Sequence, residues 1–501
     1  MRALLAAPWA YPLALAAGLL MPLGLAPVGL AWAPFAGLAV IFAVVCAAPW
    51  RRAALAAYLF GLGYAGLGVY WIFIAVGEYG GGLLAASLVT PLFVALFALL
   101  PLAALLLGRL LGRGRPAVTT LLALPLAWIL VEWVRSWLLT GATWLSIGYS
   151  QLETPLSGLA PVLGVYGVGL AIAPVAGALA WWLLSPLSLR LLAPALLALL
   201  VFGVGLLLPG RWTEPVGERL EVALIQGNVS QDQKWLEANR DRTLEHYIDT
   251  SREHFGRDLV IWPETAVPAF FHQVRDSHLA PLAEEARAAG TTLLVGAPVA
   301  DVAGEGLFNA VVSLTDPPAF YYKRHLVPFG EYVPLRDAFG GVLDFVGAPL
   351  GDFNAGTDPS PLPAAGRRIG VSICYEVTFG AEVAEALPAA ELLLNVSNDA
   401  WFGDSFAPWQ HLEMARMRAL ETGRPMLRAT NTGVTALIDH RGRLRTVGPL
   451  FEQAVVTGTV QPHQGATPYV RWGDWPVVGV VAAGLLVVGP LAGRRRKGLF
   501  R

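Results

Sequence analysis

The chain has 501 residues, enough for two or three domains, and a formal net charge of -1 at pH 7. Hydrophobic residues make up 55% of it and charged residues 14%, against roughly a quarter charged in an average soluble protein. The near-zero net charge, without a basic stripe, argues against a nucleic acid partner.

The ionisable residues are unevenly distributed. Residues 1–209 contain eight arginines and three glutamates but no aspartate, lysine or histidine, whereas all eight histidines fall between residues 210 and 475. This contrast predicts a membrane domain at residues 1–209, a water-exposed domain at residues 210–475, and a last span with a basic tail at residues 476–501. The N-terminal apolar run lacks a convincing cleavage site, so we expect a retained span rather than a signal peptide.

Eight apolar windows approach the length of about twenty residues with which a helix crosses a bilayer. Arginine and lysine mark alternate loops between these windows, which places those loops in the cytoplasm and, after seven spans, residues 210–475 outside it. The windows are 8–25, 28–48, 53–77, 82–108, 116–138, 158–185, 189–208 and 476–491, and the basic loops contain Arg2, Arg51, Arg52, Arg109, Arg113, Arg115, Arg190 and residues 494–497.

The fifth window ends with two ionisable residues. Glu132 and Arg135 are three residues apart and can pair on one helix face. Such groups at membrane depth are candidates for function, although an interfacial ion pair that orients the helix is the alternative. The aromatic and polar loop at residues 140–151 either lines a lipid headgroup site or belongs to an aromatic belt.

From Leu220 onward, short apolar strands alternate with more polar helices, which predicts a layered α/β domain. The expected strands are Val222–Ile225, Leu259–Ile261, Thr292–Val295, Ala310–Leu314, Ile369–Ile373 and Leu392–Asn395. The expected helices are 231–255, 277–289, 377–387 and 409–422.

One expected strand ends at a cysteine. Apolar residues alternate with small ones over residues 369–373, and Cys374, Tyr375 and Glu376 follow directly. A thiol at a strand end is a candidate nucleophile, whereas a small buried packing residue is the alternative. The other cysteine, Cys46, falls in the membrane domain, so we expect Cys374 to remain a free thiol.

Glu264 and Lys323 also follow apolar runs, and Glu331 comes eight residues after Lys323. A thiol with a pKa near 8.5 needs a base or a cation nearby to become a nucleophile. Glu264 could accept the proton, and Lys323 with the backbone N–H of Tyr375 could stabilise an oxyanion, while Glu331 holds the ammonium in place. The alternative is an ordinary ion pair beside a packed Cys374.

These residues and several longer motifs resemble the nitrilase (carbon–nitrogen hydrolase) superfamily and, with the membrane spans, its apolipoprotein N-acyltransferase family. One departure is Gly141-Ala-Thr-Trp144, where the family usually has Gly-Phe-Pro-Trp. The motifs are Tyr70–Ile72, Ile225–Asn228, Lys234-Trp235, Trp262–Glu264, Lys323–Pro334, Ser372–Glu376, Asn395–Gly403, Phe406–Leu412 and Arg428–Gly433.

The resemblance implies an αββα sandwich joined to the membrane helices. It also implies Glu264 as general base, Lys323 as oxyanion stabiliser and Cys374 as nucleophile. By the same resemblance, Glu331, Tyr375 and Glu376 would support these three residues around the pocket. Trp235 and the Asp399–Gly403 loop, which contains Trp401, would lie on mobile arms over the entrance.

The implied reaction is ping-pong. The cysteine takes an acyl chain from a phospholipid, typically phosphatidylethanolamine, and passes it to the α-amine of the diacylglyceryl-cysteine at a lipoprotein N-terminus. The resemblance further implies a bacterial inner membrane location with a periplasmic catalytic domain. We expect a monomer without cofactor or metal, and a membrane-dipping lid or a buried loop at residues 339–346.

Two other functions remain open from the sequence. One is a membrane-anchored amidase of the same superfamily, although a small soluble amide would not require eight spans. The other is a transporter or lipid-binding protein with an outer sensor domain, which the scarcity of charged groups within the spans disfavours.

Overall fold

The structure is a computed structural model that describes residue 5 and residues 7–185, 192–208, 210–300, 306–332 and 353–493. The expected lid at residues 339–346, Arg2, Arg190 and the basic tail at 494–497 lie outside the described residues. The chain forms two compact units: Met1–Phe73 with Ser87–Pro209 and Trp472–Arg501, and Ile74–Ala86 with Gly210–Arg471.

Apolar helices build the first unit. Within the described residues, three continuous helical stretches are long and apolar enough to cross a membrane, namely Gly82–Gly112, Pro116–Arg135 and Pro155–Leu184. The span expected at residues 53–77 corresponds to a pair of helices, Trp50–Gly68 and Trp71–Tyr79, bent by 56°, and four shorter apolar helices complete the set. The main apolar helices are α2 (Ala10–Leu20), α3 (Ala33–Ala47), α4 (Trp50–Gly68), α5 (Trp71–Tyr79), α6 (Gly82–Phe97), α7 (Leu99–Gly112), α9 (Leu124–Arg135), α10 (Ala160–Leu184), α11 (Leu192–Leu207) and α20 (Trp475–Gly493). Residues Ile74–Ala86 of α5 and α6 belong to the second unit.

Glu132 and Arg135 of α9 are both buried and hold one loop. The Glu132 carboxylate accepts from the backbone N–H of Ile147 at 3.1 Å, and the Arg135 guanidinium donates to the Ser146 hydroxyl at 3.1 Å. The Tyr64 hydroxyl donates to the carbonyl of Leu145, the preceding residue. Buried backbone groups outside regular structure need such partners, so these side chains stabilise an irregular segment inside the helical unit.

Two six-stranded sheets form the second unit, with strand orders β13-β2-β3-β4-β5-β6 and β12-β11-β10-β9-β8-β7. The central strands β2, β3 and β4 are parallel, as are β8, β9 and β10, and the flanking strands are antiparallel. The strands are β1 (Thr213–Pro215), β2 (Leu220–Gln226), β3 (Leu259–Ile261), β4 (Thr292–Ala300), β5 (Leu307–Ser313), β6 (Ala319–Tyr322), β7 (Leu362–Ala364), β8 (Arg367–Ile373), β9 (Leu392–Ser397), β10 (Met426–Thr430), β11 (Ala436–Ile438), β12 (Leu444–Val447), β13 (Ala454–Val460) and β14 (His463–Gly465).

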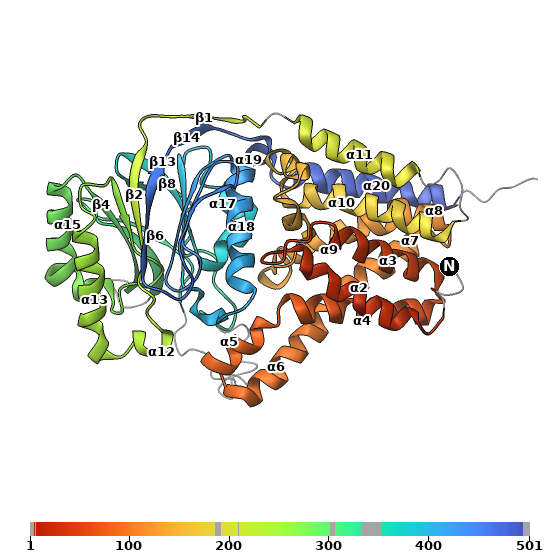
Figure 1. The fold of residues 1–501 in the computed structure, drawn as a ribbon, viewed down its shortest axis with the longest axis horizontal. Coiled ribbons are helices and arrows are strands. Elements are labelled where there is room, and N and C mark those ends of the chain that lie inside the picture. The colour runs from red at the N-terminus through yellow and green to blue at the C-terminus, as the bar shows by residue number, and fades with distance from the viewer. Residues whose placement is uncertain are drawn as a thin grey trace, which may run out of the picture. The chain divides into compact units, whose positions relative to one another are not determined.

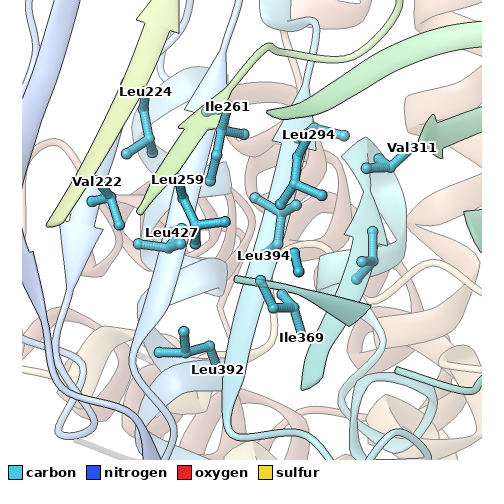
Figure 2. Close-up of a cluster of buried hydrophobic side chains, with 14 of the residues drawn as sticks. Val222, Leu224, Leu259, Ile261, Leu294, Val311, Ile369, Leu392, Leu394 and Leu427 are labelled. Carbon is cyan, nitrogen blue, oxygen red and sulfur yellow. The ribbon is translucent and has the colours of Figure 1, made fainter. Parts of the chain in front are cut away.

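The core between the sheets follows from side-chain alternation. On β2, Val222 and Leu224 point to the inter-sheet core, whereas Ala223 and Ile225 belong to the outer cluster. Side chains alternate in the same way on strand β9 of the opposite sheet, where Leu394 faces the inter-sheet core. Figure 2 shows these inner side chains meeting between the sheets.

Helices cover both outer faces of the sandwich. Helices α13 (Glu237–Arg252) and α15 (Ala280–Ala288) pack on the sheet that contains β2, and α17 (Gly380–Ala384) and α18 (Ala407–Thr422) pack on the other (Figure 1). The unit therefore has the expected four layers, helix, sheet, sheet and helix.

The six expected strands are all present, but the expected helices need correction. The helix expected at 231–255 is broken into α12 (Gln231–Lys234) and α13, because Lys234 turns inward to hydrogen-bond Thr265 while α13 packs on the sheet. The helix expected at 377–387 is reduced to α17, and the one at 277–289 begins as a turn of π-helix, Arg275–Leu279, before α15.

Candidate active site

Polar residues gather where several strands end. Glu264 follows β3 by three residues, Lys323 comes directly after β6, and Cys374 directly after β8. Because β6 runs in the same direction as the parallel strands of its sheet, Glu264 and Lys323 leave the same edge. The structure therefore brings these sequence-distant residues together through strand topology.

The Glu264 carboxylate is buried and hydrogen-bonded through both oxygens. Oε1 accepts from the Asn309 amide at 2.8 Å, and Oε2 accepts from the backbone N–H of Asn398 at 2.8 Å. The Lys323 ammonium lies 3.6 Å from Oε1. These contacts fix the carboxylate's orientation toward the other polar groups of the site.

Lys323 is 1% exposed and bonds most closely to Glu331, whose Oε1 lies 2.8 Å from its ammonium. Burial alone would lower the pKa of Lys323, but the Glu331 and Glu264 carboxylates outweigh burial and raise the pKa above its usual value. The lysine is therefore a permanently charged cation at neutral pH. Glu331 is held in turn by Asn309 at 3.1 Å and by the N–H of Val327 at 2.8 Å.

Cys374 adopts a left-handed backbone conformation, with φ of 51°, which side-chain-bearing residues rarely take. Burial raises the pKa of its thiol well above the usual value and the Glu264 charge raises it further, while Lys323 and a hydrogen bond with Ser397 oppose them. The resting sulfur is therefore a thiol, so attack on a substrate requires proton removal.

Glu376 connects the cysteine to the lysine. Its Oε2 accepts from the backbone N–H of Ile373 at 2.6 Å, and its Oε1 accepts from the N–H groups of Arg324 at 2.6 Å and His325 at 3.0 Å. Ile373 directly precedes Cys374, and Arg324 and His325 are the two residues that follow Lys323. The side chain thereby sets the spacing of the two strand ends.

Behind Cys374 lies a buried polar network that the sequence interpretation did not assign. Asp399 accepts from Arg428 at 2.8 Å and from Ser397 at 2.6 Å, and its Oδ1 lies 3.0 Å from Nδ1 of His411. Asp399 is completely buried, and the mobile arm expected at Asp399–Gly403 stays a prediction.

Three other expected site residues are exposed or pack against aromatic rings. The Trp235 side chain is 51% exposed just after α12. The Trp401 ring packs edge-on against Tyr79 at 5.2 Å between ring centroids, and the Tyr375 ring packs against Phe379 at 5.0 Å. These three residues stay predictions as functional groups.

Asn309 is a further site residue absent from the sequence expectations. Its amide donates to both Glu264 and Glu331, and so joins the two carboxylates around the lysine. The available signal was a single amide inside the apolar strand β5.

An arrangement of carboxylate, ammonium and buried thiol can support covalent acyl transfer, in which the sulfur becomes acylated.

Comparisons with known proteins agree with this geometry. Residues 221–468 match the family described as Carbon-nitrogen hydrolase, and residues 17–178 match the Apolipoprotein N-acyltransferase N-terminal domain. The fold and site thus define a carbon–nitrogen hydrolase domain that is joined to apolar helices typical of a membrane protein.

Relatives of nearly full length narrow the assignment. The apolipoprotein N-acyltransferase of Methylococcus capsulatus is 50% identical over 490 residues, covering 97% of this chain and 96% of the relative. Those of Nitrosomonas europaea and Pseudomonas putida are 42% and 41% identical, over 91% and 97% of this chain and 94% and 97% of their own lengths. The chain belongs to the apolipoprotein N-acyltransferase family.

Proposed function

We propose that this protein transfers an acyl chain from a phospholipid, with phosphatidylethanolamine as donor, to the N-terminal α-amine of a diacylated lipoprotein. The observation that carries the proposal is the convergence of Glu264, Lys323 and Cys374 at strand ends, in a chain with an acyltransferase N-terminal domain. That N-terminal match, over residues 17–178, favours lipid acyl transfer over hydrolysis of a small amide.

In the first half-reaction, Glu264 accepts the thiol proton as the sulfur of Cys374 bonds to the carbonyl carbon of the phospholipid ester. The carbonyl electron pair moves onto oxygen, where Lys323 and the Tyr375 backbone N–H stabilise the negative charge. Each such donor stabilises the transition state by about 3 kcal/mol. Collapse breaks the ester C–O bond, and the leaving lysophospholipid oxygen takes the proton from Glu264.

In the second half-reaction, the α-amine of the diacylglyceryl-cysteine attacks the thioester on Cys374. Glu264 accepts the amine proton, and the same donors stabilise the second oxyanion. Collapse breaks the C–S bond, and the proton on Glu264 returns to the sulfur. The products are the amide-linked triacylated lipoprotein and free enzyme.

We also propose the eight-span topology for the membrane-bound protein. Three long helical stretches, one bent helix pair and four shorter apolar helices of the described residues follow the eight expected windows in chain order. With basic loops on the cytoplasmic side, the catalytic domain then lies in the periplasm of a diderm bacterium. Both substrates are amphiphiles, so they can reach the site by lateral diffusion.

Acyl transfer to Cys374 provides the direct test. Purified protein in detergent is incubated with phosphatidylethanolamine labelled in its sn-1 acyl chain, and the Cys374 peptide is examined for a hydroxylamine-sensitive label. We expect a labelled thioester that discharges onto a synthetic diacylated lipopeptide. Folded wild-type protein without label on Cys374 would contradict the proposal, and Cys374→Ala is the matched blank.

A further inference from the structure

The imidazole of His411 lies directly beneath the backbone of Cys374. Helix α18 carries His411 in a completely buried position, where its Nε2 is 3.1 Å from the Cys374 carbonyl oxygen. A carbonyl oxygen can only accept a hydrogen bond, and the Arg428 guanidinium, 3.1 Å from Nδ1, can only donate, so the neutral ring that satisfies both contacts carries its hydrogen on Nε2; the charged ring carries one there as well. His411 is therefore a fixed donor to the peptide that follows the nucleophile.

Three surrounding side chains hold the ring in this orientation. The Arg428 guanidinium, 3.1 Å from the opposite ring nitrogen Nδ1, donates to it in the neutral ring, and Asp399 Oδ1, 3.0 Å from Nδ1, accepts from it when the ring is charged. Arg428 also donates to Asp399 at 2.8 Å, and the Phe402 ring packs edge-on against the imidazole. The ring has little freedom to move away from the carbonyl.

The peptide that accepts this bond is the one whose N–H belongs to Tyr375. A hydrogen bond to the oxygen of a peptide polarises that peptide and strengthens its N–H as a donor. It also fixes the plane of the peptide after Cys374, whose φ of 51° is sparsely populated. The Asn395 amide nitrogen, at 3.5 Å, is a weaker second donor to the same oxygen.

We propose that His411 is a positioning residue for acyl transfer, which donates through Nε2 to the Cys374 carbonyl and thereby aims and polarises the Tyr375 N–H toward the oxyanion. This inference rests on the proposed function, in which Cys374 is the nucleophile. The chemistry at sulfur does not pass through His411. Loss of the His411 hydrogen bond should therefore slow reactions of Cys374 that form an oxyanion. It should not change the rate of thiol reactions that form none.

Two amide variants separate the ring nitrogens. In His411→Gln, the side-chain amide extends as far as Nε2 and can still donate to the Cys374 carbonyl. In His411→Asn, the shorter amide reaches only the position of Nδ1, beside Asp399. Both variants are neutral and polar, so the pair differs mainly in the bond to Cys374. His463→Gln, which changes another buried histidine of the same unit, is the control.

Each variant is made in a Cys46→Ser background, which leaves Cys374 as the single cysteine. Two rates are measured, namely thioester formation from labelled phosphatidylethanolamine and alkylation of Cys374 by iodoacetamide, which forms no oxyanion. For His411→Asn we expect thioester formation to slow at least about tenfold, with alkylation within about threefold of wild type. His411→Gln and His463→Gln should stay within about threefold of wild type in both reactions.

Equal thioester rates in His411→Asn and wild type would overturn the inference, as would a parallel loss of both reactions in His411→Asn. If His411→Asn does not fold, His411→Gln decides: a tenfold loss of thioester formation there, with normal alkylation and melting temperature, would contradict donation through Nε2. Absence of the thioester in the wild-type protein would instead contradict the proposed function itself.

Discussion

The ammonium nitrogen of Lys234 lies 3.4 Å from the backbone carbonyl oxygen of Glu264. It also donates to the Thr265 hydroxyl at 2.6 Å, and Lys323 approaches the Glu264 carboxylate at 3.6 Å. Two of the three lysines in the sequence thus flank the proposed general base. Because Lys234 is fully buried, its charge has consequences for stability that can be measured.

The contribution of Lys234 to stability should depend on pH. Burial lowers the pKa of Lys234 to about 8, although the Glu264 charge opposes it, whereas an unfolded lysine titrates near 10.4. Between these values the unfolded chain binds more protons, so this residue's contribution to stability increases as pH rises from about 8 to about 10.4. The full change is on the order of 3 kcal/mol.

Thermal unfolding of the wild type and of Lys234→Met, at pH values from 7 to 10, checks this expectation. The melting temperature of the wild type relative to the variant should rise with pH across that window. Lys497→Met, which removes a lysine from the C-terminal tail, is the control, and its melting temperature should change with pH as that of the wild type does. Parallel curves for the wild type and Lys234→Met would contradict a lowered lysine pKa.

Neutralising Glu264 should separate thiol reactivity from catalysis. The Glu264 charge raises the pKa of Cys374, so Glu264→Gln should increase the thiolate fraction and speed alkylation severalfold at pH 8 to 9. Acyl transfer should fall by about 100-fold or more, because the base is lost. Lys323→Met should slow both reactions.

Iodoacetamide alkylation and thioester formation, both in the Cys46→Ser background, measure the two effects. Slower alkylation in Glu264→Gln than in the wild type would mean that the carboxylate activates the resting thiol, contrary to this expectation. Since both variants remove one charge next to the same sulfur, each is a control for the other.

The sequence predicted those parts of the site in which local pattern and chemistry coincide. Glu264, Lys323 and Cys374 each interrupt an apolar run at the end of a strand, and such a position is visible without knowledge of tertiary contacts. The alternation of short strands with polar helices predicted a layered α/β domain, whereas its two-sheet sandwich was implied only by the family resemblance; in the structure, alternate residues of β2 belong to the inner and outer clusters.

The remaining features depend on contacts between distant residues. Arg428 occupies the fully buried strand β10, where a charge breaks the apolar pattern. Its partners are distant in sequence: Asp399, 29 residues earlier, accepts from it at 2.8 Å, and it also contacts Asn395 and His411. The break between α12 and α13 likewise results from the contact of Lys234 with Thr265, 31 residues later. No periodicity within either segment encodes such a partner.

Glu376→Gln should destabilise the catalytic domain. The carboxylate accepts four hydrogen bonds, from three backbone N–H groups and the Tyr321 hydroxyl. In the glutamine variant, the NH2 group would replace one of the two accepting oxygens and would face hydrogen-bond donors that it cannot accept from. We expect a loss of about 1–3 kcal/mol, the cost of leaving buried donors unpaired. Chemical denaturation of the detergent-solubilised protein measures it, with the exposed Glu284→Gln as control. An unchanged midpoint would contradict the role assigned to Glu376.

Glu331→Gln should slow thioester formation while leaving the fold intact. Glu331 is the nearest anion to Lys323, at 2.8 Å, and its loss would let the ammonium pair more closely with Glu264, now 3.6 Å away. A tighter pair makes Glu264 a weaker base, so we expect a decrease of about ten- to a hundredfold. The pKa of Lys323, which Glu331 raises, should also fall, and the alkaline limb of the pH–rate profile should move to lower pH. Rates measured from pH 6 to pH 10 for Glu331→Gln, with Glu284→Gln as control, test both effects, and a variant with the wild-type rate and profile would exclude Glu331 from the electrostatics of the site.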